Sequence, residues 1–112
     1  MSRGVYVALS GAVAQEHALE TTATNLANAA TPGFQRLRPV FREVLAGASN
    51  KENLRYAEVS ATAVDGSRGA LRSTGRSLDV ALPEGQYLAV TTARGERYTR
   101  AGGLAMGADG TL

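Results

Sequence analysis

The chain has 112 residues, enough for about one domain, and its formal net charge of +2 is too small to indicate a particular partner. Apolar residues make up 44% of it, which is ordinary for a folded protein, and the lack of cysteine excludes disulfides and thiolate metal sites. No segment is long and apolar enough to span a membrane, and the first residues lack the apolar core and cleavage site of a secretory signal.

The beginning of the chain carries the apolar pattern of a long amphipathic helix. Apolar residues recur every three or four positions, with one interruption at Glu16. We call this set the helix seam: Val5, Leu9, Ala12, Leu19, Ala23, Leu26 and Ala30. Thr31 and Pro32 end the helix, because the residue before proline avoids helical dihedral angles, and Gly33 can take a positive φ. A helix over residues 3–30 spans roughly 40 Å, so we expect its seam to pack on another helix or another chain.

Three parts are predicted along the chain: an assembly helix at residues 1–30, a connector at 31–53 and the start of a β domain at 54–112. The connector contains an apolar segment around Phe41 and Val44. Its pattern fits either one short helical turn or an extended arm, and the sequence does not decide between them.

From residue 54 onward, apolar residues alternate and turn residues separate them, which is typical of short antiparallel strands. Strands are predicted at residues 56–64, 69–73, 77–82, 86–93 and 96–100. The predicted fold class is therefore α+β, with a long N-terminal amphipathic helix, an extended connector and a small antiparallel β domain. The strand expected after the turn at Asp109-Gly110 is missing, so we expect an incomplete β domain and a fragment of a longer protein.

Residues with the chemistry of an active site are scarce. His17 is the only histidine, and a lone histidine cannot build a zinc site, so a surface role beside Glu16 and Glu20 is favoured. No serine has a base near it in sequence, and Gly102-Gly103 lacks the spacing of a phosphate-binding loop. We therefore predict no catalytic residue, no cofactor and no metal, and hence that the chain is not an enzyme.

One basic cluster follows the helix, at Arg36, Arg38 and Arg42. Such an arm on a β module is one way to bind nucleic acid. Because Glu43 interrupts the cluster and no aromatic ladder accompanies it, a solvated or subunit-facing edge is the favoured interpretation.

Two segments together resemble the rod and hook proteins of the bacterial flagellum. The first, residues 25–34, reads Asn-Leu-Ala-Asn-Ala-Ala-Thr-Pro-Gly-Phe and is similar to the N-terminal signature of that family. The second begins at residues 69–82, continues at 95–102 and ends at 109–112, in the order found at the start of the family's first β domain. The opening of the chain is most similar to the proximal rod members, whereas residues 84–88 depart from the family pattern.

The resemblance implies a structural subunit of the flagellar basal-body rod that assembles with other rod subunits into the drive shaft crossing the periplasm. It implies type III export without a cleaved signal, and contacts with the export apparatus and with the protein's own C-terminal helix if the chain continues. Neither nucleic acid nor membrane insertion is expected. The alternatives are a distal rod or hook-related subunit and, in a different class, a nucleic-acid-binding β module with an Arg-rich arm.

The resemblance also assigns residues. In the assembly helix and the turn that follows it, the assigned residues are Val5, Leu9, Leu19, Asn25, Leu26, Asn28, Thr31, Pro32, Gly33 and Phe34. The side chains of Asn25 and Asn28 would bond orphan helix carbonyls or a neighbour's backbone. In the β domain, the motif residues are Gly69, Thr74, Leu78, Asp79, Val80, Tyr98, Thr99, Arg100 and Gly102.

Overall fold

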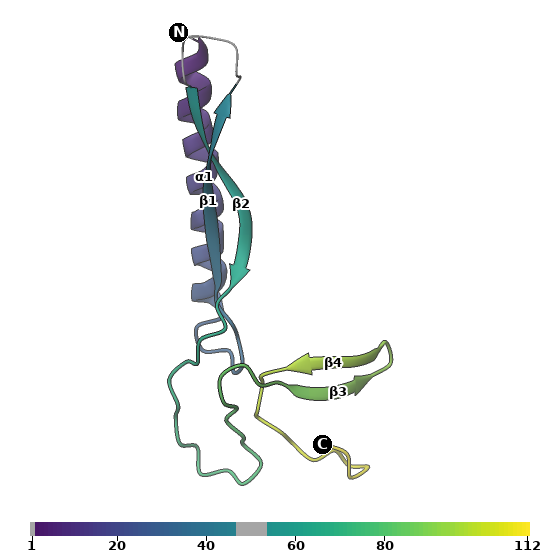
Figure 1. Ribbon diagram of the computed structural model, residues 1–112. Coiled ribbons are helices and arrows are strands. Elements are labelled where there is room, and N and C mark those ends of the chain that lie inside the picture. The colour runs from purple at the N-terminus through teal and green to yellow at the C-terminus, as the bar shows by residue number, and fades with distance from the viewer. Residues whose placement is uncertain (1, 47–53) are drawn as a thin grey trace. The chain divides into compact units, whose positions relative to one another are not determined.

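The computed structural model describes residues 2–46 and 54–112 as one helix and four strands (Figure 1). In chain order these are α1 (Ser2–Ala27), β1 (Leu37–Ala46), β2 (Leu54–Val64), β3 (Leu88–Thr92) and β4 (Gly95–Thr99). The predicted α+β fold class is confirmed. The described residues form two compact units: unit 1 lies within ranges 1–27 and 36–65, and unit 2 comprises 28–35 and 66–112.

Helix α1 has 26 residues and is about 39 Å long at 1.5 Å per residue. It ends three residues before the predicted end at Ala30, because residues 28–30 form a turn instead. The backbone N–H of Thr31 donates to the carbonyl of Asn28 at 3.0 Å, and Gly33 takes a φ of 75°. The predicted stop at Thr31, Pro32 and Gly33 is therefore correct in kind, and Ala30 of the helix seam lies outside the helix.

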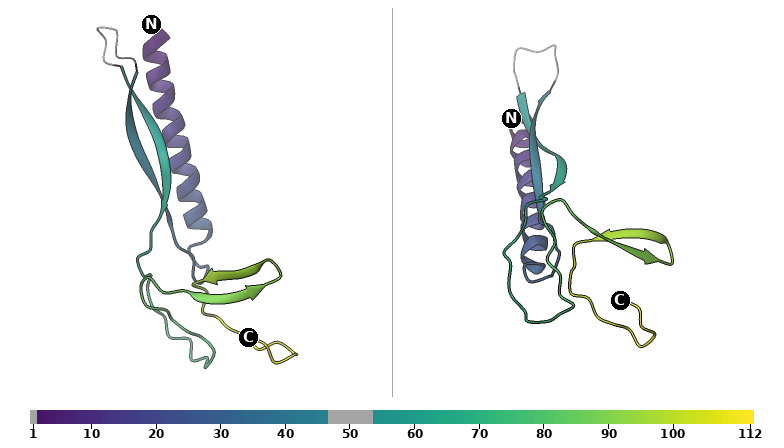
Figure 2. Two further views of the ribbon diagram at one scale, coloured as in Figure 1. Left: turned by 45° about the vertical axis from the view of Figure 1, so that its right-hand side comes forward. Right: turned by 60° about the horizontal axis from the view of Figure 1, so that its bottom comes forward.

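Strands β1 and β2 form an antiparallel hairpin that runs along α1 (Figures 1 and 2). The segment around Phe41 and Val44 is thus extended, which resolves the open alternative. Pro39 is tolerated in β1 because a two-stranded sheet leaves one edge of each strand unpaired. The register shifts between Val40 and Phe41, where the hydroxyl of Ser60 donates to the Val40 carbonyl at 3.2 Å. Residues 47–53 of the predicted connector lie outside the described residues.

The hairpin covers a face of α1 that is built from small residues. Ala14, with 4% of its surface exposed, is the one buried apolar side chain among those that the structure describes. We call this the small-residue face; its less exposed members are Val7, Ser10, Gly11, Ala14, Ala18, Thr21 and Asn25. At about 100° per residue, it lies roughly opposite the helix seam. The hairpin therefore leaves the seam uncovered.

In unit 2, β3 and β4 form a second hairpin, with Leu88 opposite Thr99 and a turn before Gly95. The predicted strands at 86–93 and 96–100 are confirmed within a few residues. The predicted strands at 69–73 and 77–82 are wrong, since the chain there forms only a single bridge, between Asp79 and Gly103. The strands form two separate two-stranded antiparallel sheets.

Candidate assembly surface and motif residues

The helix seam presents large apolar side chains to solvent. Val5, Leu9 and Leu19 are 65%, 54% and 69% exposed, and Leu26 is 75% exposed. An isolated exposed leucine is ordinary, but a row of them on one helix face marks an interaction surface. These four side chains are thus exposed in unit 1, and their packing on a partner stays a prediction.

Beside the seam, α1 and β2 border an open groove of about 540 Å³. Apolar and aromatic side chains make up much of its wall, among them Tyr6, Leu9, Val13, Tyr56 and Val59. Leu9 belongs to both the groove and the seam, so the two apolar features are continuous on unit 1.

Asn25, in the last turn of α1, bonds to strand β1. Its side-chain Nδ2 donates to the carbonyl of Leu37 at 2.8 Å, and its Oδ1 accepts from the Leu37 N–H at 2.9 Å. The amide group therefore satisfies both backbone groups of one residue, as a neighbouring strand would. The expected partner, an orphan helix carbonyl or a neighbour's backbone, is replaced by a backbone partner within the same chain.

Asn28 and Thr31 shape the turn that follows the helix. The Thr31 hydroxyl donates to Oδ1 of Asn28 at 3.2 Å, and the N–H of Phe34 donates to the carbonyl of Thr31 at 3.2 Å. Pro32 is exposed and Phe34 is half-buried. These contacts make residues 28–34 a compact, locally hydrogen-bonded turn.

Gly33 brings the first motif against the second. A Cβ on Gly33 would lie 2.3 Å from the backbone nitrogen of Ala101, far inside contact distance, and its φ of 75° is itself unfavourable for other residues. Only glycine fits this position without displacing backbone. Two motif segments that are far apart in sequence thus meet within unit 2.

A second close approach joins Gly102 to Val80. The Val80 N–H donates to the carbonyl of Gly102 at 2.9 Å, and a Cβ on Gly102 would lie 1.7 Å from the Val80 carbonyl oxygen. Nearby, the Thr74 hydroxyl donates to Oδ2 of Asp79 at 2.5 Å, and Nε of Arg76 lies 3.7 Å from Oδ1 of the same carboxylate. The motif residues 74–80 therefore fold around Asp79 as a locally bonded loop.

Arg100 organises the loop between Leu82 and Tyr87. Its guanidinium donates to the carbonyls of Pro83 at 3.0 Å, Gln86 at 2.6 Å and Leu82 at 3.3 Å, and lies 5.8 Å from the centre of the Tyr87 ring. These carbonyls would otherwise need water, so Arg100 replaces the ladder bonds that this segment does not make. A structural role accounts for these contacts of Arg100.

The other β-domain motif residues are dispersed. Gly69 lies in the exposed loop, where a Cβ would meet nothing within 4 Å, and Leu78 is half-buried. Thr99 accepts a bond from the Ala101 N–H at 3.1 Å. Tyr98 is exposed, and its hydroxyl donates to Glu96; this bond raises the pKa of the Tyr98 phenol, and desolvation adds a smaller contribution in the same direction.

Two arginines of the basic cluster have acidic partners in unit 1, one in the hairpin and one just beyond its end. Arg36 pairs with Asp65 at 2.5 Å, and Arg42 pairs with the directly opposite Glu58 at 3.0 Å. A third cross-strand pair joins Arg55 to Glu43 at 2.6 Å. The cluster is therefore used largely within unit 1, which weakens the nucleic-acid alternative.

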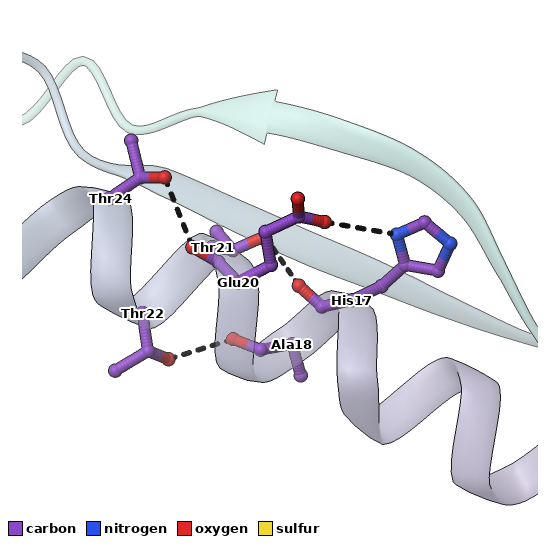
Figure 3. Close-up of polar contacts among 6 residues, drawn as sticks. All are labelled: His17, Ala18, Glu20, Thr21, Thr22 and Thr24. Carbon is purple, nitrogen blue, oxygen red and sulfur yellow. Dashed lines mark hydrogen bonds and ion pairs between the residues drawn. The ribbon is translucent and has the colours of Figure 1, made fainter.

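His17 and the neighbouring threonines have ordinary helix-surface roles (Figure 3). Nδ1 of His17 lies 3.8 Å from the Glu20 carboxylate, and the hydroxyls of Thr21, Thr22 and Thr24 each donate to the carbonyl four residues earlier. No group of three or more potential metal ligands occurs among the described residues. In the same part of the chain, no helix has the length and apolarity to cross a membrane.

Sequence reasoning missed the small-residue face and the Asn25 partner Leu37. A signal for the face was present, since Val7, Gly11, Ala14, Ala18 and Thr21 recur every three or four positions. It was hidden by the stronger pattern of the larger seam residues. Nothing local marks Leu37 as the partner of a helix asparagine.

Comparison with known proteins places the chain beside flagellar proteins. Residues 5–35 match the family described as flagella basal body rod protein. The chain is 35% identical over 112 residues to the flagellar basal-body rod protein FlgF of Mesorhizobium japonicum, covering all of this chain and 46% of that protein. It is 35% identical over 113 residues to FlgF of Salmonella typhimurium, covering all of this chain and 45% of that protein.

A second type of rod protein is also similar. The flagellar basal-body rod protein FlgG of Bacillus subtilis is 31% identical over 127 residues, covering all of this chain and 48% of that protein. The chain spans about half the length of these curated relatives.

Proposed function

We propose that this chain, which is similar along its whole length to flagellar basal-body rod proteins, acts as a structural subunit of the bacterial flagellar basal-body rod. The observation that carries the proposal is the helix seam, which stays exposed after the hairpin has covered the opposite face of α1. A subunit of a helical tube needs such a face, since its stability comes from neighbours rather than from its own core.

The free energy available from burying the helix seam favours assembly with several neighbours over a simple dimer. Burying its four large side chains gains about 1.5–3 kcal/mol each, or roughly 6–12 kcal/mol in total. Association costs about 4–15 kcal/mol in lost freedom. One seam contact is therefore near balance, and several neighbours held at once make assembly favourable.

The partners in this proposal are other rod subunits, the flagellar export apparatus and the protein's own C-terminal helix if the full-length chain continues. Its location is the basal body, with the rod in the periplasm and export without a cleaved signal. Its role is mechanical, and no reaction is assigned to it.

In this proposal residues 28–34, which follow α1, set the angle at which the chain leaves the inner layer of the rod. The support is geometric: Thr31 and Asn28 close the turn, Gly33 approaches the Ala101 backbone, and Phe34 is half-buried beside them. The second motif holds unit 2 together through Asp79, Arg100 and Gly102 and so keeps that contact in place.

Electron microscopy of basal bodies tests the proposal. A strain lacking this gene is complemented with the full-length gene carrying Leu19→Ser and Leu26→Ser, or with the matched control Gln15→Ser, which alters an exposed residue outside the seam. We expect no rods with the seam variant and normal rods with the control. Normal rods with both would overturn the rod assignment.

The same images separate the nearest alternative. A distal rod or hook-related subunit predicts a proximal rod that forms and then stops, or a complete rod without a hook. A missing proximal rod excludes both outcomes.

A further inference from the structure

The open end of the β1–β2 hairpin is fixed to α1 at one residue. Both polar atoms of the Asn25 side chain bond the backbone of Leu37, at 2.8 and 2.9 Å. Asn25 is half-buried, so these bonds are partly shielded from competing water. The contact fixes the start of β1 both along the helix and around it.

The end of β2 is tied to the same place. The N–H of Asp65 donates to the carbonyl of Arg36 at 2.9 Å, and the Arg36 guanidinium pairs with the Asp65 carboxylate, whose side chain is 12% exposed. The last residue before the hairpin and the first residue after it are thus joined. Fixing Leu37 to α1 therefore fixes both strands.

Apolar packing alone specifies this arrangement weakly. Among the described side chains of unit 1, Ala14 is the one buried apolar side chain, and the face around it is made mostly of small residues. The free energy difference between this face and a neighbouring face of α1 is correspondingly small. A rotation by one residue, about 100°, would move the hairpin towards the seam.

We propose that Asn25 is a register-setting residue, whose amide holds the hairpin on the small-residue face and thereby keeps the helix seam free for subunit packing. The last step rests on the proposed function, whereas the register itself is a property of the chain. Two directional bonds suit this role, because they select one orientation where small apolar residues do not.

Thiol accessibility measures the register directly, because the chain has no cysteine. Single cysteines are introduced by Ala14→Cys, under the hairpin, and by Leu19→Cys, in the seam. With Asn25 intact, labelling of the full chain is expected to be slow at position 14 and fast at position 19. In the Asn25→Ala background we expect labelling at position 14 to become roughly tenfold faster, from the loss of about 1.4 kcal/mol of hydrogen bonding.

Asn25→Asp separates hydrogen bonding from packing. Aspartate has nearly the same shape and can still accept from the Leu37 N–H, but at neutral pH it cannot donate to the Leu37 carbonyl. We expect it to behave like Asn25→Ala. Thr22→Ala is the control, since the Thr22 hydroxyl bonds only within α1, and it should leave both rates unchanged.

Three results overturn the proposal. They are equal rates at positions 14 and 19 with Asn25 intact, an unchanged rate at position 14 in Asn25→Ala, and a faster rate that appears only together with loss of the helical circular-dichroism signal. The last would mean that Asn25 merely stabilises α1. Rods that tolerate the seam variant would instead overturn the proposed function and leave the register result standing.

Discussion

Two glycines of this chain show how the surroundings of a residue decide the effect of one methyl group. A Cβ on Gly102 would lie 1.7 Å from the Val80 carbonyl oxygen, whereas a Cβ on Gly11 would meet nothing within 4 Å. We expect Gly102→Ala to destabilise the protein by about 3 kcal/mol or more, as overpacking and a broken backbone contact require. Gly11→Ala should stabilise α1 by about 0.5–1 kcal/mol, because alanine restricts the unfolded chain. Urea unfolding of both variants checks the difference, and equal effects would contradict it.

Asp109 is expected to make the last turn of the chain sensitive to acid. Its Oδ1 accepts bonds from the Thr111 hydroxyl at 2.7 Å and the Thr111 N–H at 3.3 Å, and these bonds lower the pKa of the Asp109 carboxyl below 3.8. A carboxyl with a lowered pKa in the folded state stabilises that state above its unfolded pKa. The stabilisation is therefore complete above the ordinary value and is lost as the pH falls through the folded pKa.

Hydrogen exchange of residues 107–111 as a function of pH, corrected for the intrinsic rate, measures this loss. Asp109→Asn is the matched control, because it keeps the shape of the side chain and removes the titration. Protection that falls equally in both proteins would show that another group is responsible.

Helices and strands that a local sequence pattern specifies could be predicted, and those that depend on pairing with a distant segment could not. The recurrence of apolar residues every three or four positions predicts α1, and the alternation around Leu88 and Val90 predicts β3. The segment around Phe41 is a strand because it pairs with β2, which no local pattern reveals. The alternation at 77–82 fails to make a strand because the Asp79 carboxylate accepts a bond from the Thr74 hydroxyl, and the Val80 N–H bonds the Gly102 carbonyl instead of a neighbouring strand.

Substitutions in the turn after α1 can distinguish an effect on rod assembly from an effect on folding. Pro32 is exposed, so Pro32→Ala should change the free energy of unfolding by less than about 1 kcal/mol. It removes the restriction on Thr31 and so permits α1 to extend. We expect few or no rods in the complemented strain, with unit 2 as stable as before.

Gly33→Ala is the contrasting variant for that test. Because its Cβ would collide with the Ala101 backbone, it should lower stability as well as assembly. Normal rods with Pro32→Ala would contradict the proposal that the angle at which the chain leaves α1 matters for assembly.

For the whole molecule, the distribution of apolar residues suits assembly better than an isolated fold. Four large apolar side chains of α1, Val5, Leu9, Leu19 and Leu26, lie on its exposed seam, and the face that the hairpin covers is made mostly of small residues. Cross-strand pairs such as Arg42 with Glu58 are exposed and contribute about 0–1 kcal/mol each. Secondary structure here is thus fixed by local bonds and register contacts, while large apolar side chains of α1 stay exposed.

This arrangement predicts a partly formed helix in the isolated chain. The covered face of α1 is made of small residues and so gains little from packing, and Asn25 anchors only the C-terminal end of the helix. At high dilution we expect a circular-dichroism signal below that of the full α1, with the loss at the end farthest from Asn25, and a rise in helicity as copies pair at higher concentration. Leu19→Ser with Leu26→Ser should abolish the rise, while Gln15→Ser should not. Full helicity in a dilute monomer would show that unit 1 is stable without neighbours. Formation of α1 would then not depend on burial of the seam, which would contradict this prediction.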